Sequence, residues 1–274
     1  MENKKTVKIY MFSAAGILLL SLALRILNFF MFYDSNIGYY SFGAVLPVIS
    51  NWILGISILS LLVFALIKFR NKEFGQCEST PKVQYISAAI ASLLVVALAV
   101  SDLSKAITTG SRIFVLSFTL SIMTALYFAV MTSDLSNRLK ALTGIFAIAR
   151  ITILILTCFT DFSVAVNTPD RAIYALAAAS ALLFVASELK LVAGNIRSWL
   201  YIFSATSTAI LGAVASIPSI IAYHAGLLPA ENSFGMEYYF MLGIAVYAAT
   251  RLISLVQRIN DTESKETEPT ENDQ

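Results

Sequence analysis

Two arginines lie within long apolar segments of the chain. Arg25 precedes Asp34 by nine residues, whereas Arg150 follows Lys140 by ten residues and precedes Asp161 by eleven. Near the centre of a membrane helix an arginine costs about 2.5 to 3.5 kcal/mol on insertion scales. Its guanidinium donates hydrogen bonds to backbone carbonyls, hydroxyls, amides, carboxylates or an anionic ligand. A site for a carboxylate or a phosphate is therefore the first chemistry that these residues suggest.

The role of the arginines depends on the groups that can neutralise them. Asn28 and Asn51 are candidate partners for Arg150. If protein groups suffice, Arg25 and Arg150 are structural residues that bond between helices. If they do not, both are candidate ligand-binding residues. In either case we expect the two side chains to point into a helix bundle, because lipid cannot neutralise a guanidinium.

The carboxylates are expected near the boundaries of the membrane. Asp34, Asp102 and Asp161 fall at the outer ends of apolar segments, and Glu188 falls near the inner end of another. We therefore expect no carboxylate at the depth of the second arginine, which favours a bound anion there. Glu188 and Lys190 are expected to extend to the interface, with a proton-coupling role for Glu188 as the alternative.

Metal and cofactor sites have little support. His224 is the only histidine, and Cys77 and Cys158 are expected on opposite sides of the membrane. No ligand set has metal spacing, so we assign no catalytic residue, no metal ligand and no cofactor. An intramembrane enzyme that acts on lipid is an alternative, with His224, Asp102 or Asp161 as acid–base groups. No nucleophile–base spacing is recognisable for it, so the chain is not expected to be an enzyme.

The elements that must position these residues are membrane helices. Hydrophobic residues make up 58% of the 274 residues and charged residues 13%, with a mean hydropathy of +0.76, which exceeds what a water-soluble core needs. A spanning helix requires roughly 20 apolar residues. Segments of this kind occur at 9–33, 43–67, 84–101, 113–132, 141–160, 172–191, 200–223 and 238–255. The sequence predicts an all-α polytopic transmembrane helix bundle with eight spans.

The orientation follows from the basic residues, which collect in cytoplasmic loops. With eight spans, Lys105, Arg112 and Arg171 fall on one side. The other side receives Lys4, Lys5, Lys8, Lys68, Arg70, Lys72, Lys82, Arg138, Lys140, Lys190, Arg197, Arg251, Arg258 and Lys265. This asymmetry predicts that both termini are cytoplasmic.

The predicted organisation has three parts. Residues 1–8 form a short basic N-terminus, 9–256 the transmembrane domain, and 257–274 a tail with almost no apolar residues, which is expected to be disordered. Each half of the membrane domain opens with a helix that carries an arginine followed by an aspartate. The halves could therefore form a 4+4 parallel pseudo-repeat, although coincidence is the alternative.

The favoured function is a small-molecule transporter or permease, or its membrane subunit, with an intramembrane arginine site. A non-catalytic sensor or accessory protein is the second hypothesis, and the lipid-active enzyme is the third. We expect a multi-pass protein of the cell membrane, the cytoplasmic membrane of a bacterium. Its expected partners are the lipid bilayer, a small-molecule substrate and another membrane protein. The net charge of +2 gives no reason to expect nucleic acid.

Overall fold

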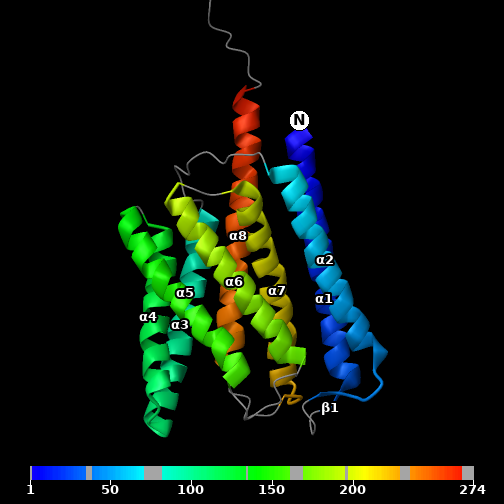
Figure 1. Cartoon of the computed structure of the whole chain (residues 1–274), viewed down its shortest axis with the longest axis vertical. Helices are drawn as coiled ribbons and strands as arrows, with labels where there is room; N and C mark the ends of the chain where they lie inside the picture. The colour runs from blue at the N-terminus through cyan, green and yellow to red at the C-terminus, as the bar shows by residue number, and fades with distance from the viewer. Residues whose placement is uncertain are drawn as a thin grey trace, which may run out of the picture.

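The computed structural model describes residues 2–34, 39–70, 82–133, 135–160, 169–194, 197–228 and 235–266. Within these ranges the chain forms eight helices and one short hairpin of two strands (Figure 1). The helices are α1 (Glu2–Phe32), α2 (Val45–Phe69), α3 (Lys82–Thr109), α4 (Arg112–Met131), α5 (Asn137–Thr160), α6 (Pro169–Val192), α7 (Ser198–His224) and α8 (Gly235–Glu266). The strands β1 (Tyr33–Asp34) and β2 (Tyr39–Tyr40) pair antiparallel between α1 and α2. The predicted all-α bundle is confirmed.

Every helix is long and apolar enough to cross a membrane. The helices also expose large apolar side chains on the flanks of the bundle, for example Phe12, Trp52, Leu93, Leu156 and Leu176. A water-soluble protein rarely exposes apolar surface on this scale. The backbone polar groups of such segments are satisfied within each helix. The chain is a multi-pass membrane protein.

Six of the helices form a closed ring. Around it α3 packs on α4, α4 on α5, α5 on α6, α6 on α7, α7 on α8, and α8 returns to α3. The helices α1 and α2 form a separate hairpin that packs on α7 from outside the ring, at one side of the molecule in Figure 1. The helix neighbours therefore divide the chain into two plus six helices. The 4+4 pseudo-repeat stays a prediction, and superposing residues 9–132 on 141–255 would test it.

The centre of the molecule is α7, which packs on α8, α6, α1 and α2. Most of its residues are buried, and many are small or hydroxylated. A Cβ added at Gly212 would lie 2.9 Å from the Cβ of Ala245 on α8, a separation that real Cβ atoms do not reach. The close contact of α7 with α8 therefore depends on the missing side chain of Gly212.

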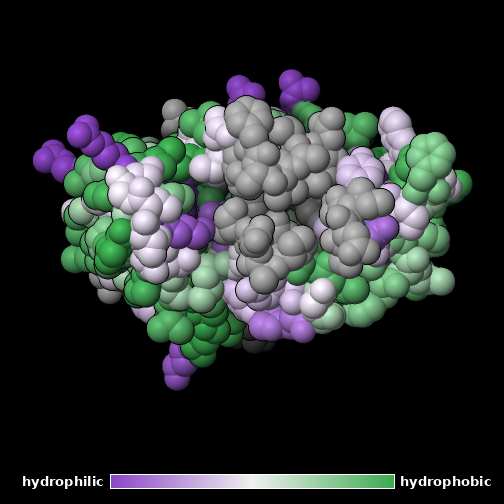
Figure 2. Space-filling view, turned by 90° about the horizontal axis from the view of Figure 1, so that it is seen from below, coloured by the Kyte–Doolittle hydropathy of each residue, from purple (hydrophilic) through white to green (hydrophobic). Residues whose placement is uncertain are grey.

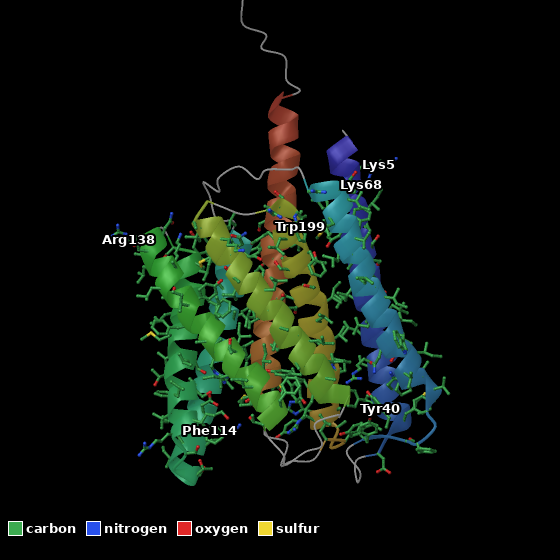
Figure 3. The ribbon with its side chains drawn as sticks, viewed as in Figure 1. Lys5, Tyr40, Lys68, Phe114, Arg138 and Trp199 are labelled. Carbon is green, nitrogen blue, oxygen red and sulfur yellow. The ribbon has the colours of Figure 1, made fainter. Side chains whose placement is uncertain are left out.

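The first helix begins and the last helix ends at the same end of the bundle, here named the terminal end (Figure 1). Lys5, Lys68 and Arg138 lie at this end, whereas Tyr40 and Phe114 lie towards the opposite, far end (Figure 3). Figure 2 looks onto the far end, where hydrophilic residues lie at several separate points among hydrophobic ones. Three of the basic residues that the sequence assigns to one side, Lys5, Lys68 and Arg138, thus share an end. That this end is cytoplasmic stays a prediction.

Three predicted features fall partly or wholly outside the described residues. These are the position of Cys77 within residues 71–81, the position of Asp161, and the end of the chain from 267. The structure describes α8 as far as Glu266, within the predicted tail, and the disorder of the tail stays a prediction. A helix that has already formed is extended at little cost, since each added residue brings one hydrogen bond.

Candidate functional site

The interior of the six-helix ring holds an ion pair between α3 and α5. A terminal guanidinium nitrogen of Arg150 on α5 lies 3.1 Å from Oδ2 of Asp102 on α3. Two serines of α4 complete the group. The hydroxyls of Ser117 and Ser121 donate to the same carboxylate oxygen at 2.9 and 3.3 Å, and Nε of Arg150 donates to the hydroxyl of Ser121 at 2.8 Å. All four side chains are buried. We call them the Arg150 cluster.

This cluster corrects the expectation that Arg150 has no carboxylate at its depth. The apolar pattern predicts that the third span ends at 101, but α3 continues to Thr109. Asp102 therefore lies about 10 Å of helix before the end of α3, and its side chain is buried in the bundle. Asn28 and Asn51 are not the partners of Arg150. The prediction that Arg150 points into the bundle agrees with its burial.

A second ion pair lies inside the ring nearer the terminal end. Nε of Arg251 on α8 donates to Oε1 of Glu188 on α6 at 2.5 Å, and another guanidinium nitrogen donates to the side-chain oxygen of Gln84 on α3 at 3.1 Å. Glu188 is fully buried and Arg251 is 9% exposed. A buried charge pair is stable only when further hydrogen bonds satisfy the remaining polar atoms.

Three tyrosines supply those bonds. Tyr127 of α4 and Tyr247 of α8 donate to Oε2 of Glu188 at 2.6 and 3.2 Å, and Tyr201 of α7 donates to Oε1 at 3.2 Å. All three hydroxyls come from different helices of the ring. We call Gln84, Tyr127, Glu188, Tyr201, Tyr247 and Arg251 the Glu188 cluster.

The Glu188 cluster corrects two further expectations. Glu188 does not extend to the interface, because its side of α6 faces the interior of the ring. Lys190, two residues later and on another side of the helix, is exposed. Arg251, which the sequence assigns to the basic residues outside the membrane, is buried in the bundle and lies within the eighth candidate span. The signal that could have found this pair is the arginine four residues before the end of an apolar segment, which requires a buried partner.

Aromatic rings fill the ring interior beside the Glu188 cluster. Tyr247 packs edge-on against Phe128 with ring centroids 5.1 Å apart, and against Phe184 at 6.1 Å. Phe184 in turn lies 6.0 Å from Tyr201. These contacts hold the tyrosine hydroxyls in place.

Arg25 belongs to the outer hairpin and not to the ring. Its guanidinium lies over the rings of Phe29 and Tyr40, 5.1 and 5.6 Å from their centroids, and its side chain is buried. One helical turn away, the amide nitrogen of Asn28 donates to the hydroxyl of Ser50 on α2 at 2.7 Å. The two arginines expected from the sequence therefore lie in separate environments. Arg150 lies within the ring, and Arg25 lies in the hairpin outside it.

The other predicted site residues lie apart from both clusters. Asn51 is exposed on α2, and Asp34 is half-buried in β1. The exposed His224 ends α7, and its Nε2 lies 2.6 Å from the hydroxyl of Tyr239. Asp161 falls outside the part of the chain that the structure describes.

Comparison of the chain with protein-family models, with curated proteins and with solved structures gives no match. The two clusters are therefore the features of the molecule that bear on its function. Each brings together one acid, one arginine and hydroxyl groups in the interior of a membrane bundle. Such a group can exchange a proton, or it can exchange its carboxylate for that of a ligand.

Proposed function

We propose that the chain is a small-molecule transporter or permease, or the membrane subunit of one, with its binding site at the Arg150 cluster. The observation that carries the proposal is the ion pair of Arg150 and Asp102, buried in the ring. Arg150 lies near the middle of α5. Ionisable residues at such depth in membrane proteins are rare and commonly belong to substrate or ion pathways.

Stability alone is a weak reason for such a pair. Removing two charges from water costs several kcal/mol per ion, and well-packed apolar residues of similar volume are often as stable or more stable. A role in binding accounts for the charges. The guanidinium is planar and can hold a carboxylate or a phosphate with two parallel hydrogen bonds.

The substrate class that fits is a small molecule with a carboxylate or phosphate group. In the described conformation Asp102 occupies one side of the guanidinium. A substrate anion would take the place of Asp102 on Arg150, while Ser117 and Ser121 keep the aspartate hydrogen-bonded. This exchange of partners keeps the arginine neutralised in both states, whereas Asp102 loses its counter-charge and has to bind a proton as the anion enters.

Uptake into vesicles tests the proposal. The purified chain is reconstituted into liposomes, and entry of radiolabelled acetate, succinate and inorganic phosphate is measured one at a time. We expect uptake of at least one anion above protein-free liposomes. Arg150→Lys keeps the charge but loses the planar fork, so it should lower that uptake at least tenfold. Arg138→Lys is the matched control, because Arg138 is exposed at the terminal end. Equal uptake by the Arg150→Lys variant and the unmodified chain would contradict the proposal.

The second candidate function is a non-catalytic sensor or accessory protein that contacts another membrane protein. The observation that favours it is Asn51, an exposed amide near the start of α2, one turn before the exposed Gly55. In a membrane, amides bond across helices and small residues allow close approach. On this hypothesis Asn51→Leu changes the association state of the chain in detergent or lipid. The chain then transports no anion, with or without Arg150→Lys.

A further inference from the structure

One face of α4 carries a hydroxyl group at each of four successive turns. Ser117, Ser121, Thr124 and Tyr127 are separated by four, three and three residues, and this spacing places neighbours about 5 to 6 Å apart on the same side of a helix. All four side chains are buried. We call these residues the α4 hydroxyl row.

The two ends of the row are hydrogen-bonded to the two buried carboxylates. At the far end, Ser117 and Ser121 donate to Asp102. At the terminal end, Tyr127 donates to Glu188 at 2.6 Å. Between these ends, Thr124 donates to the backbone carbonyl of Leu120 at 2.7 Å. The row of hydroxyls on one side of α4 thus extends from the Arg150 cluster to the Glu188 cluster, with Thr124 between its two hydrogen-bonded ends.

We propose that protons pass between Asp102 and Glu188 along the α4 hydroxyl row, so that the proton is the coupling ion of the transporter. This inference rests on the proposed function, and it assigns to the row a role in that transport. Chains of ionisable side chains such as Asp and Glu serve as proton relays in other membrane pumps and transporters. The row is suited to this use because each hydroxyl can both accept and donate a hydrogen bond.

The transfer keeps the charge of every hydroxyl constant. When Asp102 is protonated, it gives its proton to the oxygen of Ser121, and Ser121 gives its own proton to Thr124. Thr124 passes one to Tyr127, which releases its phenolic proton to Oε2 of Glu188. Asp102 ends as a carboxylate and Glu188 as a neutral acid. The Thr124 hydroxyl must turn away from Leu120 during this step, or a water molecule must bridge it to its neighbours.

The charged groups around the two acids define the end states. Asp102 faces Arg150 from α5 and the two serines from α4. Glu188 faces Arg251 and Tyr247 from α8 and Tyr201 from α7, besides Tyr127. Because each acid has its own arginine, a proton that leaves one acid restores that ion pair and weakens the other. The two pairs are thereby linked to the position of one proton.

Proton entry into liposomes tests the route directly. The chain is reconstituted with the pH-sensitive dye pyranine inside, a potassium gradient and valinomycin provide an inside-negative potential, and the initial rate of acidification is measured. We expect the unmodified chain to exceed protein-free liposomes. Thr124→Val should lower the protein-dependent rate at least tenfold, and Thr124→Ser, which keeps the hydroxyl, should retain it. If Thr124→Val fails to fold, Thr124→Ala replaces it in the comparison with Thr124→Ser.

The matched control is Thr206→Val on α7. Thr206 is as buried as Thr124 and its hydroxyl also donates to the carbonyl four residues earlier, at 2.7 Å from Ile202, but it lies outside the row. The rate of proton entry with Thr206→Val should equal that of the unmodified chain. Equal rates for Thr124→Val and the unmodified chain, or no protein-dependent proton entry with or without the transported anion, would overturn the route.

The outcome is separable from that of the proposed function. Anion uptake that depends on Arg150, without proton entry, removes the proton route and leaves the transporter. Proton entry that depends on the Thr124 hydroxyl, without uptake of any of the three anions, supports the route and contradicts the transporter.

Discussion

Arg251 on the last helix donates from Nε to Oε1 of Glu188, 63 positions earlier in the chain. The bond joins α8 to α6 across the interior of the ring, and Gln84 extends it to α3. Together with the pair of Arg150 and Asp102, it gives the ring two charged centres at different depths. Variants at these two centres show whether the charged residues serve the stability of the fold, transport, or both.

The first prediction concerns the balance of charge in the Arg150 cluster. Arg150→Leu leaves Asp102 buried without its counter-charge, which should lower the free energy of unfolding by about 3 to 5 kcal/mol. The double variant Asp102→Leu with Arg150→Leu should recover most of that loss but transport nothing. Unfolding of the purified chain by dodecyl sulfate measures the first effect, and anion uptake measures the second. A double variant less stable than the single one would contradict the account.

The second prediction concerns the tyrosine with the shortest bond to Glu188. Tyr127→Phe removes one hydroxyl and leaves the ring in place, so Glu188 loses a charge-assisted hydrogen bond worth about 1.5 to 3 kcal/mol. Tyr85→Phe is the control, because Tyr85 is exposed on α3. Thermal unfolding in detergent should show a lower midpoint for Tyr127→Phe and an unchanged one for Tyr85→Phe. Identical midpoints would mean that the bond contributes nothing.

The third prediction concerns the contact between α7 and α8. Gly212→Val places a side chain where even a Cβ lies 2.9 Å from that of Ala245, and overpacking of this kind typically costs about 1 to 3 kcal/mol. Gly16→Val on α1 is the control, since a Cβ there meets nothing within 4 Å. Dodecyl sulfate unfolding should rank Gly212→Val below both Gly16→Val and the unmodified chain. The opposite ranking would show that α7 and α8 can separate without cost.

The fourth prediction concerns orientation. The basic residues at the terminal end predict that this end is cytoplasmic. Single cysteines replacing Lys68 and Arg138, in a chain with Cys77 and Cys158 changed to alanine, should react with a membrane-impermeant maleimide only after the cells are opened. A cysteine replacing Lys105 should react in intact cells. Labelling of positions 68 and 138 on different sides would refute the eight-span topology.

The fold was predictable because its signals are local. A run of about 20 apolar residues must form a helix in lipid, since nothing else there satisfies the backbone. The depth of Asp102 was less accessible, because an aspartate after an apolar run resembles a boundary residue until the length of α3 is known. The burial of Arg150 was predictable from the free-energy cost of exposing an arginine to lipid, but the identity of its partner was not predictable.

The Glu188 cluster shows a different limit. Its members lie on α3, α4, α6, α7 and α8, and their proximity follows from which helices are neighbours in the ring. Apolar periodicity does not specify those neighbours. The α4 hydroxyl row, by contrast, could be read from spacing, since Ser117, Ser121, Thr124 and Tyr127 occupy one side of a helix. Only the two carboxylates at its ends required the structure.

The wide sequence separation within each ion pair has a consequence for biosynthesis. Ribosomes add about 5 to 20 residues per second, so Glu188 is made roughly 3 to 13 seconds before Arg251 by the same rate. During that interval the sixth span has its acid but not its arginine. A ribosome that stalls after α7 therefore releases a chain with an unneutralised carboxyl in its membrane segments. We expect such truncated chains to be retained by the insertion machinery or degraded, so that completion of α8 acts as the checkpoint for assembly.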